Sequence, residues 1–398
     1  MRIRGRRWIG IGLYAAVLVG VAALSAYLSR NLSGRGPIPE RSQFARRLPG
    51  TPDGEAWRFS FFYATNRATD AENDAFDGDG RRMSDQISTG TFDVRISSRL
   101  PVAPWVWFDD KLMKMVGRTD LSRDEAFSRL RDAVAASPNR SLLIVVWGWR
   151  DWFHSAAMRT AYTAYVLDIN TPVLLFDWPG NQGEGATGYL ASRRVAHQAG
   201  PVLGQVLARV VRESGAERLW LMGSSLGCQT ICDAFSWMMT QSDAASSGPG
   251  IDHVVLSAPD VSAREFDDRF AGEITALARH LTAYVASNDQ ALLLGNWING
   301  SRRLGRSAVA APLADESGTQ LQGALDLLDL QAKGAHNIAV VDATPINRKR
   351  NLHHFFTDSP EFFDDLYRHL LEPDNPIGRR LYPVRTEGGS TFWILWNY

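Results

Sequence analysis

The sequence predicts an α/β fold in which a mainly parallel, doubly wound sheet is flanked by helices. Eight short apolar segments have the length and composition of buried strands, and helical segments lie between many of them. Alternation of strands and helices is typical of parallel sheets, because each crossover helix returns the chain to the same edge of the sheet. With 398 residues, of which 45% are apolar and 22% charged, the chain is long enough for one large domain with additional segments.

The expected elements follow one another along the chain. Strands are expected at 58–63, 92–96, 142–147, 173–176, 219–222, 254–257, 281–287 and 338–342. Helices are expected at 124–136, 155–167 and 201–213, the last of which places its apolar residues on one face. The final segment, TFWILWNY at 391–398, is strand-like and aromatic. It is compatible with an added edge strand, a cover over the site or a contact with a membrane surface.

The N-terminal region predicts a membrane anchor. A basic flank, residues 1–7, precedes the uncharged segment 8–28, whose 21 residues are enough for one transmembrane helix. A cleaved signal peptide is the alternative, although its apolar core is usually shorter. The basic flank favours a cytoplasmic N-terminus, which would place the remaining chain in a bacterial periplasm. We expect a linker at 29–55, a catalytic domain at 56–371 and a C-terminal extension at 372–398.

The segment LWLMGSSLGCQT, which begins at Leu219, has the pattern of a nucleophile elbow. An apolar strand leads into Gly223-Ser224-Ser225-Leu226-Gly227, and a helical pattern follows. In Gly-x-Ser-x-Gly the serine sits on a strained turn between strand and helix, and the flanking positions must be small. Ser225 is the one serine that fits the central position. A small-residue loop without catalytic function is the alternative interpretation.

A serine nucleophile needs a base and an orienting acid, which in this arrangement follow in the order Ser, Asp, His. Asp289 comes directly after an expected strand, and His353 and His354 follow the next strand after a short loop. Asp260 is an alternative acid, although its position after a strand also suits a helix N-cap. We expect Asp289 to be the acid because of its strand position, and the base to be one of the two adjacent histidines.

The tetrahedral intermediate also needs N–H groups directed at its oxyanion. The main-chain N–H of Leu226, at the start of the helix after the nucleophile, is one expected donor. The second donor should come from the loop after the strand LLIVVW, which reads GWRDWF, and we assign it to Trp149. Nearby tryptophans, Trp147, Trp152 and Trp178 with Trp149, are candidates to line an apolar acyl pocket or to pack the core.

Taken together, these motifs resemble the α/β-hydrolase superfamily, and more narrowly a bacterial group of largely uncharacterised hydrolases that are often membrane-anchored. The resemblance spans about 61–371 and rests on an ordered set of motifs: FFYATNR, FDWPG, GSSLG, SAPD, YVASNDQAL and HHFFTDSPEFFDDL. It implies that His353 is the base, with His354 as the alternative, and that Asp289 is the acid. The chain departs from the group in three places: WGWR replaces a His-Gly-Tyr-Asn type loop, Ser-Ser-Leu replaces His-Ser-Met, and YLASRRVA lacks an acidic residue.

The function that these observations predict is a membrane-anchored serine hydrolase of carboxylic esters. Its Ser225-His353-Asp289 triad would work through an acyl-enzyme intermediate on a small-molecule or lipid-like ester. The zero net charge gives no sign of nucleic-acid binding, and no metal-ligand or phosphate-loop motif predicts a metal or cofactor. The alternative is a catalytically silent binding or scaffolding protein of the cell envelope with the same fold.

Overall fold

The computed structural model describes residues 46–68, 81–103, 106–241, 250–306, 338–348, 353–372, 379, 381–385 and 391–396. The strands within these ranges are β1 (Thr51–Asp53), β2 (Ala56–Arg67), β3 (Met83–Ser97), β4 (Met113–Leu121), β5 (Ser141–Val146), β6 (Val173–Asp177), β7 (Arg218–Ser224), β8 (Ile251–Ser257), β9 (Ala278–Val285), β10 (Ile338–Asp342), β11 (Leu381–Arg385) and β12 (Thr391–Leu395). The helices are α2 (Arg123–Ala136), α3 (Phe153–Leu167), α4 (Gly185–Glu213), α5 (Leu226–Met239), α6 (Ala263–Glu265), α7 (Ala271–Leu277), α8 (Gln290–Asn299), α10 (Phe355–Asp358) and α11 (Pro360–Leu371), with the short turns η2 (Val106–Phe108), η3 (Phe266–Phe270) and η4 (Leu304–Arg306).

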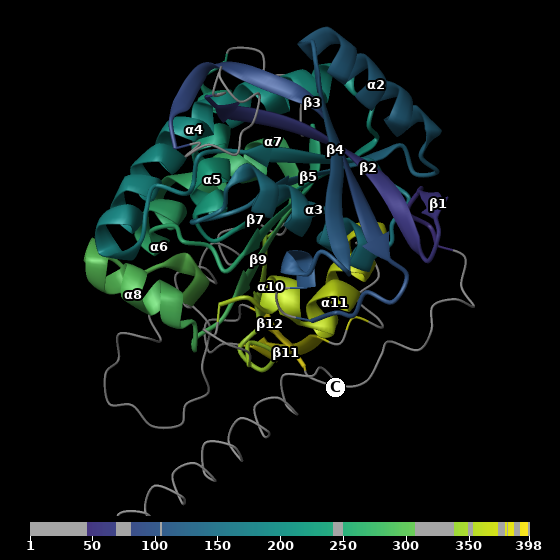
Figure 1. Ribbon diagram of the computed structural model, residues 1–398. Helices are drawn as coiled ribbons and strands as arrows, with labels where there is room; N and C mark the ends of the chain where they lie inside the picture. Colours follow the sequence, from purple (N-terminus) through teal and green to yellow (C-terminus); the bar gives the residue numbers. More distant parts are fainter. Residues whose placement is uncertain are drawn as a thin grey trace, which may run out of the picture.

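One sheet organises the described residues. Its order is β11-β12-β10-β9-β8-β7-β5-β6-β2-β3-β4, with β1 paired to β2 (Figure 1). The consecutive run from β12 to β2 is parallel throughout. The predicted mainly parallel sheet flanked by helices is therefore confirmed. The carboxyl ends of its central strands meet at one edge, where the loops after β5, β7, β8 and β9 lie together.

The two ends of the sheet are antiparallel and extend beyond the expected strands. At one end β2, β3 and β4 pair antiparallel, and at the other end β11 pairs antiparallel with β12. The strand-like C-terminal segment thus joins the sheet, where β12 pairs parallel with β10. The last residues of the segment expected as a linker contact the domain, because Arg46 binds Asp168 and β1 pairs with β2.

Apolar side chains cover both faces of the sheet and form two cores. In β5 all six residues are buried, and alternate ones point to opposite faces: Leu143 and Val145 enter one core, and Leu142 and Ile144 the other. Helices α3 and α11 pack on the first face, whereas α2, α4, α5 and α7 pack on the second. A near-continuous apolar strand is typical of a parallel sheet covered on both sides.

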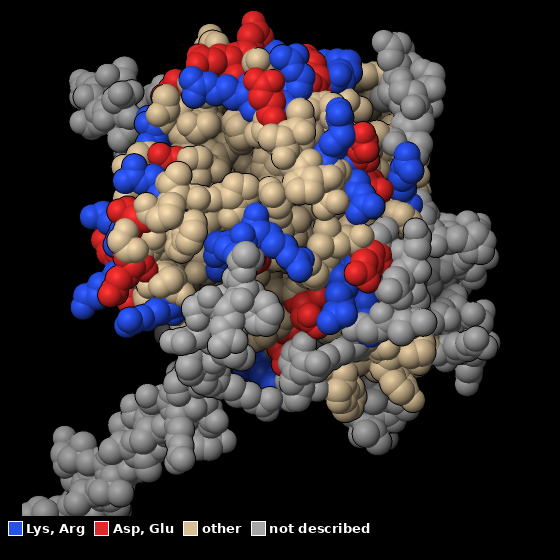
Figure 2. Space-filling view, turned by 90° about the vertical axis from the view of Figure 1, so that its right-hand side faces the viewer, with Lys and Arg blue, Asp and Glu red and all other residues tan. Residues whose placement is uncertain are grey.

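On the face drawn in Figure 2, acidic and basic side chains surround an uncharged area, and a group of basic side chains lies at the lower border of that area. The presence of both signs agrees with the formal net charge of zero. The apolar segment 8–28 lies outside the described residues. Among the helices that the structure does describe, none has both the length and the apolar character needed to cross a membrane.

Candidate active site

Ser225 lies on a sharp turn between β7 and α5. Its φ of 52° and ψ of −126° place it in a region that non-glycine residues rarely adopt. The glycines of the motif explain how strand and helix approach so closely. A Cβ on Gly223 would lie 2.5 Å from Ile231 Cδ1, and one on Gly227 would lie 2.4 Å from the Val146 carbonyl oxygen. The predicted elbow geometry is therefore present, with a serine at its apex.

The loop after β5 packs directly against this turn. A Cβ on Gly148 would lie 2.8 Å from Ser225 Cβ and 3.3 Å from the Leu226 main-chain nitrogen. Leu226 is the first residue of α5, so its N–H has no acceptor within the helix. For the N–H of Trp149, which follows Gly148, the described residues provide no acceptor either. Both predicted oxyanion donors thus belong to backbone that surrounds the serine.

Asp289 and His353 form a buried pair at the same edge. His353 Nδ1 lies 2.6 Å from Asp289 Oδ2, and Asp289 Oδ1 accepts the Leu292 N–H over 2.9 Å. The aspartate is the N-cap of α8 and is fully buried. Burial by itself lowers the pKa of His353, but the charge and hydrogen bond of Asp289 outweigh it, so the pKa is raised. With Nδ1 bound to Asp289, Nε2 is the nitrogen left for a substrate or nucleophile.

The structure brings the serine and the His–Asp pair to one edge without joining them by a hydrogen bond. Ser225 is half-buried, and its hydroxyl makes no hydrogen bond to any described residue, including His353. Asp260 links the two parts, because its N–H donates to the Ser225 carbonyl over 3.1 Å and its charge contributes to the raised pKa of His353. Catalytic hydrogen bonds are often long in unliganded enzymes.

The two alternative residues have different surroundings. Asp260 makes no hydrogen bond with either histidine; both of its carboxylate oxygens accept the Tyr189 hydroxyl, over 3.1 and 2.8 Å. His354 is buried beside Phe356, and burial lowers its pKa well below the ordinary value. A histidine whose pKa lies well below the ordinary value resists protonation and is poorly suited to be a general base. The geometry favours Asp289 and His353.

A buried arginine to which no role was assigned from the sequence holds the loop after β5. Arg67 is fully buried and binds Asp177 through Nε, over 2.6 Å, and through a second nitrogen. The same guanidinium donates to the main-chain carbonyls of Asp151 and Trp178, each over 2.7 Å. The Trp178 indole in turn donates to the Trp147 carbonyl over 2.8 Å. We refer to Arg67, Asp177 and Trp178 as the loop clamp.

The loop clamp comes from two motifs, FFYATNR and FDWPG, which were recognised only as part of the resemblance. The available signal in the sequence was an arginine close after an apolar strand segment. If such an arginine is buried, it needs a partner, because a guanidinium is not buried alone. Of the four tryptophans considered for a pocket, Trp147 and Trp178 are buried and hydrogen-bonded, and Trp152 is 53% exposed. Trp149 is partly buried, with its ring edge-on to Tyr189.

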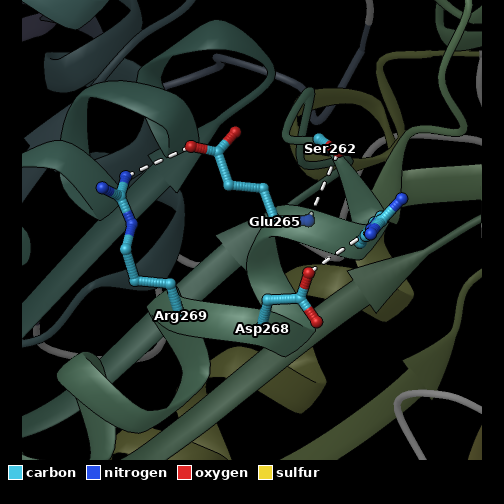
Figure 3. A pocket seen from close by; sticks show the side chains of 5 residues that line it. Ser262, Glu265, Asp268 and Arg269 are labelled. Atoms are coloured by element: carbon cyan, nitrogen blue, oxygen red, sulfur yellow. Dashed lines mark hydrogen bonds and ion pairs between the residues drawn. The ribbon is translucent and has the colours of Figure 1, made fainter.

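A charged pocket elsewhere is not a better candidate. It has a volume of about 380 Å³ and is lined by Ser262, Arg264, Glu265, Asp268 and Arg269 (Figure 3). Its arginines pair with its own acidic residues, over 3.2 Å for Arg269 and Glu265. The carboxylates of this pocket are paired with its arginines, and the Ser262 hydroxyl accepts the Glu265 N–H over 3.4 Å. The described residues also contain no group of three or more side chains suited to hold a metal ion.

Comparison with known proteins adds one match. The model of a family described as "Alpha/beta hydrolase of unknown function (DUF900)" matches residues 122–368, which is more than half of the chain. The match includes the elbow, Asp260, Asp289 and His353, and it begins after the antiparallel strands β1 to β4. A search of curated proteins found no match.

Proposed function

Since this chain belongs to the DUF900 family of α/β hydrolases of unknown function, we propose that it is a serine hydrolase that cleaves carboxylic esters. The observation that carries the proposal is the His353–Asp289 pair, 2.6 Å between Nδ1 and Oδ2, at the sheet edge that bears the strained Ser225. Strained backbone at a polar residue is characteristic of functional sites. A base that is paired with a buried carboxylate has the chemistry that a serine nucleophile requires.

In the proposed reaction, Ser225 Oγ attacks the ester carbonyl carbon while His353 Nε2 takes the hydroxyl proton. The imidazolium then gives this proton to the leaving alcohol as the C–O bond of the tetrahedral intermediate breaks. Water attacks the resulting acyl-enzyme by the same route, which releases the acid and restores the serine. Asp289 orients the imidazole and stabilises its charge, and the N–H groups of Leu226 and Trp149 bind the oxyanion.

The proposed location is the inner membrane, with residues 8–28 as a single anchor and the hydrolase domain outside the cytoplasm. The support is the uncharged length of this segment and the basic flank before it. Protease treatment of intact spheroplasts tests the orientation. Digestion of the hydrolase domain is expected, whereas a domain protected until the membrane is lysed would contradict the proposed orientation.

A fluorophosphonate probe tests the chemistry on the full-length chain in detergent, because it labels only activated serines. Labelling is expected for the wild-type protein and for Ser224→Ala, whose buried hydroxyl has no partner, and it should be lost in Ser225→Ala and His353→Ala. The matched serine variants separate an effect of the nucleophile from an effect of a small change in the elbow. Hydrolysis of p-nitrophenyl esters of increasing acyl length then tests the ester class.

A second candidate function is that of a silent binding protein with a hydrolase fold. It is favoured by the absence of a hydrogen bond between Ser225 and His353 in the described structure and by the altered Trp-Gly-Trp-Arg loop. A folded wild-type chain that the probe does not label at any pH would support this candidate over the enzyme.

A further inference from the structure

The loop after β5 is attached to the domain in two ways. The loop clamp binds its main chain, because Arg67 donates to the Asp151 carbonyl over 2.7 Å. The second attachment is the buried side chain of Asp151, which contacts α3 instead of the clamp. Asp151 comes two residues after Trp149, whose N–H is a proposed oxyanion donor. The side chain of Asp151 therefore ties the part of the loop that matters most for the proposed reaction to a second element.

Both carboxylate oxygens of Asp151 have a partner on α3. Oδ1 accepts the Ser155 hydroxyl over 3.0 Å, and Oδ2 lies 2.9 Å from Nη1 of Arg159. The side chains of Asp151 and Arg159 are 7% and 9% exposed, so water and salt screen this ion pair only weakly. Separating the partners of a buried pair is costly, whereas exposed pairs contribute little. The contact is therefore strong enough to fix the loop.

Two tryptophan rings fix the guanidinium of Arg159. Its central carbon lies 5.3 Å from the ring centroid of Trp107 and 5.3 Å from that of Trp147, a distance typical of cation–π contacts. The Trp147 ring is itself held, because its indole N–H donates to the Thr160 hydroxyl over 2.8 Å. In the described part of the chain, Nε of Arg159 makes no hydrogen bond. The position of the guanidinium therefore depends on the two rings and on Asp151.

The backbone of the loop depends on such contacts. Arg150, between Trp149 and Asp151, has a φ of 67°, in the left-handed region that residues with a side chain rarely adopt. A conformation of this kind persists only where the surrounding structure imposes it. The Arg150 N–H donates to the Gly180 carbonyl over 2.9 Å, and Asp151 is held on the other side of the turn. Release of the Asp151 side chain would let the turn relax and would shift the Trp149 N–H.

We propose that Asp151 is a positioning residue for the loop after β5. Arg159, held between the two tryptophan rings, fixes the Asp151 carboxylate and thereby keeps the Trp149 N–H directed at the oxyanion. The inference rests on the function proposed above, in which Trp149 is an oxyanion donor. It also assigns a task to the connection between β3 and β4, which carries Trp107 and lies outside the residues that the family model matches.

The charges around Asp151 determine which variants are informative. Burial raises the pKa of Asp151 more than the charge of Arg159 lowers it. In Arg159→Met the carboxyl would therefore take up a proton, keep its contact with Ser155 and lose its attachment to residue 159. In Asp151→Asn alone, Arg159 would be left buried without an anion, which endangers the fold. The double variant Asp151→Asn, Arg159→Met removes both charges and leaves no buried charge unpaired.

The test uses this double variant in the full-length chain in detergent. Neutral residues of similar volume often replace a buried ion pair without loss of stability, so the variant should fold. For p-nitrophenyl butyrate, kcat should fall by about 10- to 100-fold with KM within about threefold, because the oxyanion forms only in the transition state. Hydrogen exchange measured by mass spectrometry should become about tenfold faster in the peptide that covers 147–152 and stay unchanged elsewhere.

Two further variants and one control accompany the test. Arg159→Lys keeps a cation, and one nitrogen is enough for the contact with Asp151 Oδ2, so kcat should stay within about threefold of the wild-type value. Arg159→Met replaces the double variant if the latter does not fold, and the same changes in kcat and exchange are expected. The matched control is Asp365→Asn, Arg379→Met, which removes a buried ion pair outside the site and should alter neither kcat nor the exchange of 147–152.

An unchanged kcat in the folded double variant, with or without faster exchange of 147–152, would overturn the positioning role. An equal fall of kcat in the matched control would also overturn it, because general destabilisation would then be the cause. Exchange does not depend on catalysis, so the two proposals can fail separately. If the fluorophosphonate probe does not label the wild-type chain but the double variant loosens 147–152, the enzyme proposal fails and the anchoring of the loop by Asp151 stands.

Discussion

The two edges of the sheet bury histidines in opposite electrostatic settings. At the carboxyl edge, His353 pairs with Asp289, and its pKa is raised despite burial. At the amino edge, His253 and His369 share the Thr282 hydroxyl, over 3.1 and 2.6 Å, and their rings lie 3.9 Å apart. Burial lowers the pKa of His253 to about 3 and that of His369 well below its ordinary value.

The difference shows that the partner of a buried histidine determines what it can do. A carboxylate partner keeps the imidazole ready to accept a proton, as a general base requires. At the amino edge, Arg379 donates to His369 Nδ1 over 2.7 Å and binds Asp365, so the acid is occupied by arginine and the imidazole stays neutral. The amino edge is thus a polar packing element. Substitutions at the carboxyl edge should therefore affect activity, and those at the amino edge should affect stability.

The largest effect is expected for Asp289→Asn. Asparagine still caps α8 but cannot stabilise the imidazolium, so kcat/KM for an activated ester should fall by ~10³- to 10⁴-fold with little change in the thermal midpoint. The matched change at the amino edge, Asp365→Asn, should lower the thermal midpoint and leave kcat/KM within about threefold. If Asp289→Asn keeps most of its activity and Asp260→Asn does not, the acid has been assigned to the wrong carboxylate.

A smaller loss is expected for Arg67→Lys in the loop clamp. Lysine keeps the charge but cannot make the two-pronged contact with Asp177 and also reach both main-chain carbonyls. A shift of the loop after β5, which carries the proposed oxyanion donor Trp149, should lower kcat by about 10²-fold and change KM much less. Arg379→Lys is the control at the amino edge and should affect stability alone. An equal loss in kcat for both variants would show that general destabilisation, rather than the loop, is responsible.

The pH dependence of stability should differ between the edges. His253 and His369 are neutral when folded, and unfolding lets them bind protons below pH ~6.5. Each therefore reduces the free energy of unfolding by about 1.4 kcal/mol per pH unit as the pH falls below that value. Urea unfolding at pH 7, 6 and 5 measures how the free energy of unfolding changes with pH. His253→Gln should reduce this slope by about 1.4 kcal/mol per pH unit, which corresponds to one proton fewer bound on unfolding. His353, whose pKa is raised, contributes stability below pH ~6.5 that is lost as the pH rises.

The smallest effect on stability is expected for Ser225→Gly, although this change also removes the proposed nucleophile. Glycine adopts the backbone of the elbow without strain, so the free energy of unfolding should rise by about 1 kcal/mol while labelling disappears. Ser224→Gly, whose φ is not positive, is the control and should not be stabilised. A destabilised Ser225→Gly variant would mean that the elbow is not strained in solution.

Chain order and strand ends were enough to predict the sheet edge at which the structure places Ser225, Asp289 and His353. Apolar runs located the central strands, and the fixed order of Ser, Asp and His led to Ser225, Asp289 and His353, whose catalytic roles stay predictions. The helix expected at 201–213 is the second half of a longer helix that begins at Gly185, and Pro201 lies inside it. Local patterns do not show whether a proline ends a helix or is tolerated within it.

The contacts that hold the site were not predictable in the same way. Arg67 and Asp177 are 110 positions apart, and Arg303 and Asp260 are brought together by backbone pairing between loops. Such partners are chosen by the register of the sheet, which periodicity does not encode. The antiparallel strands β1 and β4 were missed because they are short or half exposed, so their apolar pattern is weak.

Asp289 and Ser225 would also evolve differently in a lineage that stopped using the site. One oxygen of Asp289 binds His353, while the other caps α8. Selection for a stable helix would retain this aspartate after catalysis had been lost. Ser225 has no such second use, and its backbone favours glycine. Genetic drift would therefore replace the serine before the aspartate, and the residue at the elbow, rather than the acid, would be the one that separates active from inactive relatives of this chain.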